Sequence, residues 1–448
     1  MKVRSADTRV AGFAFVVPGR LDQFTGGYLF DRRVVDGARA RGRCVHVIEL
    51  PGTFPDADDI ARAAASDALA RLPDAHVVVI DGLALPAFAH CLAAHAHRLR
   101  LTGLVHHPLA LETGLSAEAS QRVALLEARL WRLLRGVLCP SAHTARAVAA
   151  AGIETARIVI APPGVDRPAA DPGTLQTVSD DHAASDHHAA PDDRAVPHDH
   201  AAPKDRPATR PPTGAHGNHP HAVPSPVRLL TIATVTPRKG HRLLVEALAP
   251  LEDLDWRLDC IGSLTRDPQT TASVRAAIDA HRLGARITLC GELPTQAVTA
   301  ALRDADVFVL PSFHEGYGMV FAEALAHGLP IVATTAGAIP DTVPGDTGLL
   351  VPPGDVRALS EALRRVVEDT ALRTRLAAAA RRAGRRLPDW PAAVDRWLAG
   401  LDVLAGLDGL AGEDANVGAD GRVGPDGLAG PDGHARADGR VRPDAGAA

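Results

Sequence analysis

Residues 306–335, DVFVLPSFHEGYGMVFAEALAHGLPIVATT, contain three apolar runs, separated first by a glycine-rich loop and then by the segment GLP. This order predicts a buried strand, a loop, a helix that ends at Gly328, and a second strand that Pro330 opens. Short apolar strands that alternate with helices belong to parallel sheets with both faces covered. The stretch therefore predicts an α/β fold.

Two blocks of the chain repeat this alternation. The first contains the apolar runs GFAFVVP, CVHVIEL, HVVVIDG, TGLVHHP, GVLCPS and RIVIAPPG, and the second contains VRLLTIATV, RLDCIGS, RITLCGE, DVFVLPS and PIVATTA. We therefore predict two Rossmann-like domains that face a cleft. Ligands of such sheets bind at the carboxyl ends of the strands, so the cleft is the expected site.

Changes of composition along the chain also predict how it divides into domains, linker and tail. The N-terminal domain is expected over residues 1–167 and the C-terminal domain over residues 227–385. Residues 168–226 are rich in Asp, His, Ala and Pro, which predicts a disordered linker, and the loose spacing of its histidines favours a spacer over a metal site. Residues 386–404 are predicted to form a helix that packs across the domains, and the Gly/Asp-rich residues 405–448 a disordered tail.

Composition limits the class of protein. The 448 residues carry a formal net charge of -5, so no nucleic-acid partner is indicated. Five cysteines stand far apart in apolar runs, which predicts reduced, buried thiols and a cytoplasmic location. No apolar run reaches the length of about 18 residues that a transmembrane helix needs. The apolar run near the N-terminus is too short for a signal peptide.

Two glutamates, Glu315 and Glu323, lie eight positions apart in the opening stretch. Glu323 falls on a helix that is apolar nearly all round, and burying it would require donors such as the hydroxyls of a sugar or ribose. Alternatively, Glu323 and His327 form the one solvated stripe of that helix. For Glu315, in the loop, an exposed surface carboxylate is the simpler interpretation. The N–H groups of the helix start, 318–320, could bind an anion.

Three further stretches contain candidate residues. In TIATVTPRKGHRLLVEAL, the adjacent cations Arg238 and Lys239 follow a strand, where they suit a diphosphate but could equally form a solvated basic loop. In VVPGRLDQFTGGYLFDRR, Gly26 and Gly27 lie between the first strand and the first helix, a weak signal for a nucleotide loop. In GLVHHPLALETG, a histidine pair follows a strand, where a structural role is the commoner one.

Taken together, these stretches resemble the retaining glycosyltransferases of family 4, which have the GT-B fold. HEGYGMVFAEALAHGLPIVAT matches that family's signature of two glutamates separated by seven residues, and AGAIPDTV and TGLLVPPGD follow in the family's order. TPRKGH resembles its phosphate-binding turn, TGGYLFDRR its first glycine loop, and APPGVD the end of its N-terminal domain. The resemblance covers residues 10–167 and 227–400.

The resemblance implies a role for each candidate. Glu323 would accept hydrogen bonds from the ribose of a sugar nucleotide, and Lys239 would hold its diphosphate. Glu315 would orient the donor sugar, and either His106 or His107 would lie where donor and acceptor meet. The remaining implied donor-binding positions are Gly318, Met319, Val320, Gly26, Gly27 and Asp341. Many family members carry a diphosphate-binding Gly-Arg pair where this chain has Ala233 and Thr234, and Arg238 is the candidate to compensate.

The resemblance also implies an activity. It predicts a hexosyltransferase that uses a UDP or GDP sugar, retains the anomeric configuration, and needs neither a cofactor nor a metal. The N-terminal domain would hold the acceptor, which could be a small molecule, a lipid or a glycan, and a peripheral membrane contact stays open. Two alternatives remain: a sugar-nucleotide-binding homologue without transferase activity, and an epimerase or phosphorylase on the same frame.

Overall fold

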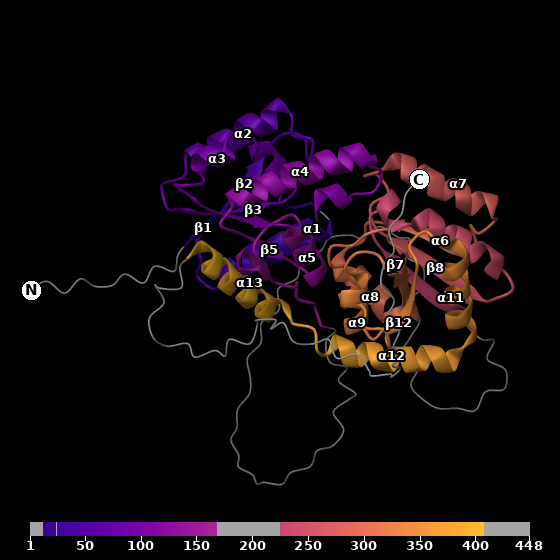
Figure 1. The fold of residues 1–448 in the computed structure, drawn as a ribbon. Helices are drawn as coiled ribbons and strands as arrows, with labels where there is room; N and C mark the ends of the chain where they lie inside the picture. The colour runs from indigo at the N-terminus through magenta and orange to yellow at the C-terminus, as the bar shows by residue number, and fades with distance from the viewer. Residues whose placement is uncertain (1–11, 24, 168–224, 407–448) are drawn as a thin grey trace, which may run out of the picture. The chain divides into compact units, whose positions relative to one another are not determined.

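A computed structural model describes residues 12–23, 25–167 and 225–406 (Figure 1). These residues contain two six-stranded sheets, and all neighbouring strands in both sheets pair in parallel. The predicted α/β class with two Rossmann-like sheets is therefore confirmed. The linker and tail predicted from the sequence lie almost entirely outside the described residues.

The first sheet has the strand order β2-β1-β3-β4-β5-β6. Its strands are β1 Phe13–Pro18, β2 Val45–Leu50, β3 Val77–Asp81, β4 Arg100–Leu104, β5 Gly136–Cys139 and β6 Ile158–Ile160. The helices that connect them are α1 Gly26–Ala40, α2 Asp59–Ala70, α3 Leu92–His95, α4 Ala117–Leu133 and α5 Ala142–Ala150. Every residue of β1, β3 and β5 is buried, as expected for parallel strands covered on both faces.

The second sheet has the order β12-β11-β10-β7-β8-β9. Its strands are β7 Val227–Ile232, β8 Trp256–Ile261, β9 Ile287–Gly291, β10 Val307–Leu310, β11 Ile331–Thr334 and β12 Gly348–Val351. The helices are α6 His241–Leu248, α7 Pro268–Ala280, α8 Thr295–Asp304, α9 Met319–Ala326, α10 Ile339–Thr342, α11 Val356–Glu368 and α12 Thr370–Gly384. The opening stretch of the sequence thus forms β10, α9 and β11, as predicted.

The two strand orders determine where a ligand can bind. The chain reverses its direction of travel across the sheet between β1 and β3 in the first sheet, and between β7 and β10 in the second. At such a switch point, the loops that follow the two strands diverge and leave a crevice. The switch points therefore bring together the loops that follow β7 and β10, which carry Lys239 and Glu315.

The last described helix, α13 Trp390–Ala405, packs on the first sheet although it follows the second in sequence. It contacts α1, β4 and β5, and Figure 1 shows it beside the N-terminal strands. Trp397 is 1% exposed, and its ring centroid lies 5.8 Å from that of Phe13 and 6.1 Å from that of Phe15. The helix therefore completes the hydrophobic core of the first sheet.

The cysteines differ in part from the prediction. All five are free, and Cys91, Cys139 and Cys260 are buried, but Cys290 is only partly buried, and Cys44 is exposed because it lies in the loop before β2 rather than within the strand. Within the described ranges, no helix has both the length and the apolar character that crossing a membrane requires.

Replacing Trp397 with Ala should lower the free energy of unfolding by about 3–5 kcal/mol, because it empties a fully buried aromatic position. Urea denaturation followed by circular dichroism measures this change. Val403→Ala, on the same helix at a position that is 53% exposed, is the control and should change it by less than about 0.5 kcal/mol. Equal effects of the two substitutions would contradict the packing of α13 described above.

Candidate functional site

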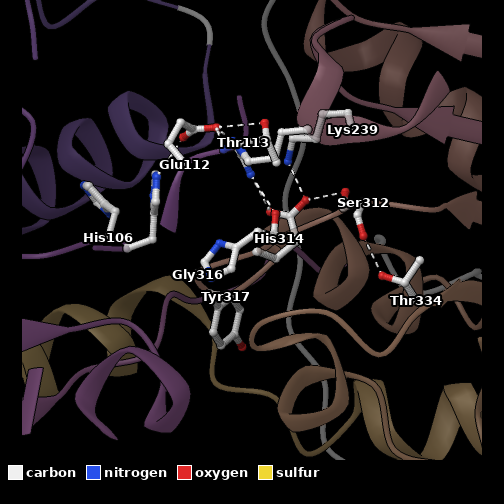
Figure 2. A network of polar contacts seen from close by, with 12 residues as sticks. His106, Glu112, Thr113, Lys239, Ser312, His314, Gly316, Tyr317 and Thr334 are labelled. Carbon is white, nitrogen blue, oxygen red and sulfur yellow. Dashed lines mark hydrogen bonds and ion pairs between the residues drawn. The ribbon is translucent and has the colours of Figure 1, made fainter. Parts of the chain in front are cut away.

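A buried ion pair lies at the switch point of the second sheet. Nζ of Lys239, in the turn after β7, lies 2.6 Å from Oε1 of Glu315, in the loop after β10 (Figure 2). The hydroxyl of Ser312 donates to the same carboxylate oxygen over 2.6 Å. Glu315 is 5% exposed, so the interpretation as a surface carboxylate is wrong. The pair links two segments that are 76 residues apart in the sequence.

The charges around Glu315 keep it ionised. Burial disfavours its carboxylate, but the charges of Lys239 and Arg238 outweigh burial and hold the pKa of Glu315 below its ordinary value. Burial also lowers the pKa of the Lys239 ammonium, against the attraction of Glu315. The site therefore contains a desolvated carboxylate whose compensation depends on two cations from the β7 turn.

Arg238 connects this pair to the N-terminal half of the chain. Its Nη1 donates to the carbonyl oxygen of His314 over 2.9 Å and lies 3.5 Å from Oε2 of Glu315. Its Nε lies 3.2 Å from Oε1 of Glu112, which belongs to the segment after β4. The basic turn is therefore built into a network of ion pairs and is not a solvated loop.

Helix α9 begins beside Glu315 and supplies donors. Gly318 is its N-cap and has a φ of 81°, a left-handed conformation that favours glycine. Within the described part of the chain, the backbone N–H groups of Gly318, Met319 and Val320 donate to no other residue. The N-terminus of a helix with free N–H groups attracts anions, as the sequence predicted for this position.

Glu323 lies one turn further along α9 and is partly buried. Burial raises the pKa of its carboxyl to about 7, with a further increase from the charge of Asp166 and a decrease from Arg33. Among the described residues, no side chain or backbone group donates a hydrogen bond to this carboxylate. Glu323 and His327 are both partly buried, and Nε2 of His327 is buried with no hydrogen-bond partner among the described residues, which does not favour a solvated stripe.

The two candidate histidines have different environments. Nε2 of His106 lies 3.0 Å from Oδ1 of Asp31 and 3.3 Å from Oδ2 of Asp81, both of which are buried carboxylates. Burial disfavours its protonation, but the two carboxylates outweigh burial and raise the pKa of His106 well above its ordinary value. The arrangement favours an imidazolium held by Asp31 and Asp81. The three ligand atoms lie within 4.8 Å of one another, so this is also the set of described residues that could hold a metal ion, although the sequence predicted none.

His107 points to a different partner. Its Nε2 lies 3.1 Å from Oε2 of Glu112, whose other oxygen contacts Arg238. Burial alone would raise the pKa of Glu112, but the hydrogen bond from His107 and the charge of Arg238 lower it to about 2. The buried Glu127 fixes this segment, because its carboxylate accepts from the N–H groups of Leu109 and Ala110 over 2.8 and 3.1 Å.

The remaining predicted positions lie around this network. Gly26 and Gly27 are the first residues of α1 rather than part of the loop before it, which corrects the expected boundary. A Cβ at Gly27 would lie 3.5 Å from the ring of His106, an ordinary van der Waals distance, so Gly27 lies beside that histidine but the contact does not require glycine. Asp341 forms an exposed ion pair over 3.0 Å with Arg146 of the N-terminal half, and within the described part of the chain it forms no ion pair or hydrogen bond with Glu315 or Lys239.

Gly316 lies against the N-terminal half of the chain. A Cβ at this position would lie 2.0 Å from the carbonyl oxygen of His106, so only glycine fits. The hydroxyls of Ser141 and Thr144, at the start of α5, both donate to the carbonyl oxygen of Gly316. The loop that carries Glu315 is therefore held directly against the segment that carries His106.

Sequence reasoning missed several polar residues of this network. They are Asp31, Asp81, Glu112, Glu127, Ser141, Thr144 and Ser312. The place of Asp81 in the site could have been predicted, because it ends the apolar run VVVID at the carboxyl end of a strand. That of Glu112 could not, since its partner Arg238 is 126 positions away in the sequence.

Comparisons with known proteins agree with this fold. A sucrose-phosphate synthase structure from Thermosynechococcus elongatus aligns with a TM-score of 0.65 at 18% identity, covering 90% of this chain and 100% of that one. The HepE protein of Anabaena, solved with UDP and glucose, aligns with a TM-score of 0.60 at 16% identity over 88% of this chain and 99% of that one. These similarities show that the fold is GT-B.

Family models identify the chain more closely. The model described as Glycosyltransferase Family 4 matches residues 24–167, and that described as Glycosyl transferases group 1 matches residues 226–369. Together the matches cover more than half of the sequence. Each half of the chain therefore matches a glycosyltransferase family model, and the family 4 resemblance of the sequence is consistent with both matches.

Curated relatives match over a shorter region. The putative colanic acid biosynthesis glycosyltransferase WcaL of Escherichia coli is 33% identical over 150 residues, which are 31% of this chain and 36% of that protein. The D-inositol 3-phosphate glycosyltransferase of Corynebacterium glutamicum is 31% identical over 150 residues, or 32% of this chain and 36% of that protein. The matched region thus spans about a third of the length of these relatives.

Gly316→Ala should destabilise the protein, because its Cβ would overlap a backbone carbonyl that cannot move alone. We expect a loss of about 1–3 kcal/mol in the free energy of unfolding, measured by chemical denaturation. Gly345→Ala is the matched control, since a Cβ there would meet nothing within 4 Å. A variant Gly316→Ala as stable as this control would show that the two segments do not make the close contact.

Proposed function

We propose that this protein is a retaining hexosyltransferase that takes its sugar from a nucleoside-diphosphate sugar, UDP- or GDP-linked, without a metal. The observation that carries the proposal is the convergence of Lys239, Arg238 and the free N–H groups of helix α9 around the buried Glu315. Two cations and a helix N-terminus form a site for a diphosphate, and the carboxylate beside them can accept hydrogen bonds from sugar hydroxyls.

Glu323 supports a nucleotide donor. Its partly buried carboxylate accepts no hydrogen bond from the described residues, and burial and the charge of Asp166 raise its pKa, so donors from a ligand would stabilise the ionised form. The two hydroxyls of a ribose would supply them. The Anabaena structure, in complex with UDP and glucose, supports a donor of this class.

Sugar transfer would break the bond between the anomeric carbon and the β-phosphate oxygen while an acceptor oxygen bonds to the same face of that carbon. The proton of the acceptor hydroxyl would pass to the departing phosphate oxygen, which balances the reaction. Negative charge grows on the diphosphate as the bond breaks, and Lys239, Arg238 and the N–H groups of Gly318, Met319 and Val320 would stabilise it. Glu315 would orient the sugar and stabilise positive charge at the anomeric carbon.

The histidines divide the remaining roles in this proposal. His106, held by Asp31 and Asp81 and lying beside Gly27, is the better candidate for the junction of donor and acceptor. His107 is hydrogen-bonded to Glu112, so its role would be to order the segment that faces Arg238. The acceptor would lie on the side of the N-terminal half, and its chemical class is the next property to determine.

A panel of UDP and GDP sugars should reveal at least one that the purified protein hydrolyses slowly without an added metal. Lys239→Met should then lower kcat/KM for that donor by about 100-fold, because one charge on the leaving group is no longer compensated. Arg242→Met removes an exposed cation three positions away, whose partner is Glu246, and should have little effect. The proposal fails if no sugar nucleotide is turned over or if the two variants behave alike.

Affinity for UDP should rise as the pH passes through about 7 and should level off above it, because the ribose hydroxyls bind the ionised form of Glu323. Binding must release the proton that burial holds on this carboxyl below pH 7, so affinity falls as the pH is lowered. Titration calorimetry between pH 6 and 8 measures the dependence, and Glu323→Gln should both weaken binding and flatten the profile. Because UDP itself titrates, the comparison is between the profiles of the two proteins. Parallel profiles would remove Glu323 from the ribose site.

A further inference from the structure

Glu112 touches the candidate donor site although no motif marks it. It follows the short 3-10 helix Leu109–Leu111 in the N-terminal half of the chain. One of its carboxylate oxygens lies 3.2 Å from Nε of Arg238, and the other lies 3.1 Å from Nε2 of His107. Figure 2 shows Glu112 at the side of the network that faces Lys239 and His314.

We propose that Glu112 is a positioning residue that holds the guanidinium of Arg238 in place for the diphosphate of the donor. The inference rests on the proposed function and deepens it, because it gives the N-terminal half a part in binding the donor. Glu112 itself would not touch the donor and would act through Arg238.

The contacts of Arg238 show how this would work. Its Nε faces Glu112, and its Nη1 donates to the carbonyl oxygen of His314 and lies near Glu315. Among the residues that the structure describes, none accepts a hydrogen bond from Nη2. The guanidinium is thus fixed on two sides while one of its amino groups remains available for a ligand. A fixed fork loses less conformational freedom when it binds a phosphate than a mobile one does.

Glu112 is well suited to fix another side chain because it is fixed itself. His107 contacts one oxygen, and the N–H of Thr113 donates to the other over 3.2 Å. The segment before it is anchored by Glu127 through two backbone hydrogen bonds. Three residues of the N-terminal half, His107, Thr113 and Glu127, therefore determine where the Glu112 carboxylate lies.

The position of Arg238 matters because it and Lys239 are the two cations that form ion pairs with Glu315 among the described residues. The negative charge of Glu112 acts in the opposite direction, because it repels an anionic donor. Its side chain is 40% exposed, however, so water screens this repulsion, whereas the contact with Nε acts directly on the guanidinium. We therefore expect the net effect of Glu112 to favour binding.

The test measures UDP binding to the full-length protein by titration calorimetry. Glu112→Ala should weaken binding about tenfold, and Glu112→Gln, whose amide oxygen can still accept from Nε, should weaken it less. Glu118→Ala, which removes an exposed carboxylate from helix α4 of the same half, should leave binding unchanged. Thermal unfolding of each variant checks that the fold is intact.

The decisive comparison uses the background Arg238→Met. There Glu112→Ala should cause no further loss, because no guanidinium remains to be held. Unchanged or tighter binding of UDP by Glu112→Ala, or the same loss in both backgrounds, overturns the positioning role while the proposed function stands. If the wild-type protein binds neither UDP nor GDP and hydrolyses no sugar nucleotide, the proposed function fails, and this inference fails with it.

Discussion

The ion pair between Glu315 and Lys239 is the interaction on which the rest of the site depends. A carboxylate that is 5% exposed would be costly to ionise alone, and the structure compensates it with Lys239, Arg238 and the hydroxyl of Ser312. Because these groups come from the loops after two different strands, the pair can form only where those strands are neighbours. The order of the second sheet provides this by placing β7 beside β10.

The same constraint extends to the N-terminal half. Arg238 contacts both Glu315 and Glu112, so the compensation of the buried carboxylate is continuous with a carboxylate from the segment after β4. Gly316, next to Glu315, lies against the backbone of His106 and accepts from Ser141 and Thr144. The loop that carries Glu315 is thus held by both halves. Lys239 and Arg238 of the C-terminal half neutralise the Glu315 side chain, and the N-terminal half holds the loop backbone at Gly316.

Much of this organisation could be predicted from local sequence. Apolar runs of four to seven residues between helical patterns predicted the parallel strands, and the glycine-rich loop before an apolar helix predicted the N-terminus of α9. The start of α1 was predicted to follow Gly26 and Gly27, but the helix begins at Gly26, since these glycines can begin a helix as readily as they can form a loop. Cys44 was predicted to be buried from its apolar neighbours, yet burial in a strand begins one residue later, at Val45.

The sequence by itself determined the fold class and the segments that carry the candidate site, because each depends on spacing within one strand, loop and helix. Only the tertiary structure decided which charges meet. It separated His106, held by Asp31 and Asp81, from His107, held by Glu112, although the two are adjacent in the chain. The physical reason is that an ion pair depends on the distance between atoms, and the strand order, not the sequence separation, brings residue 112 to residue 238.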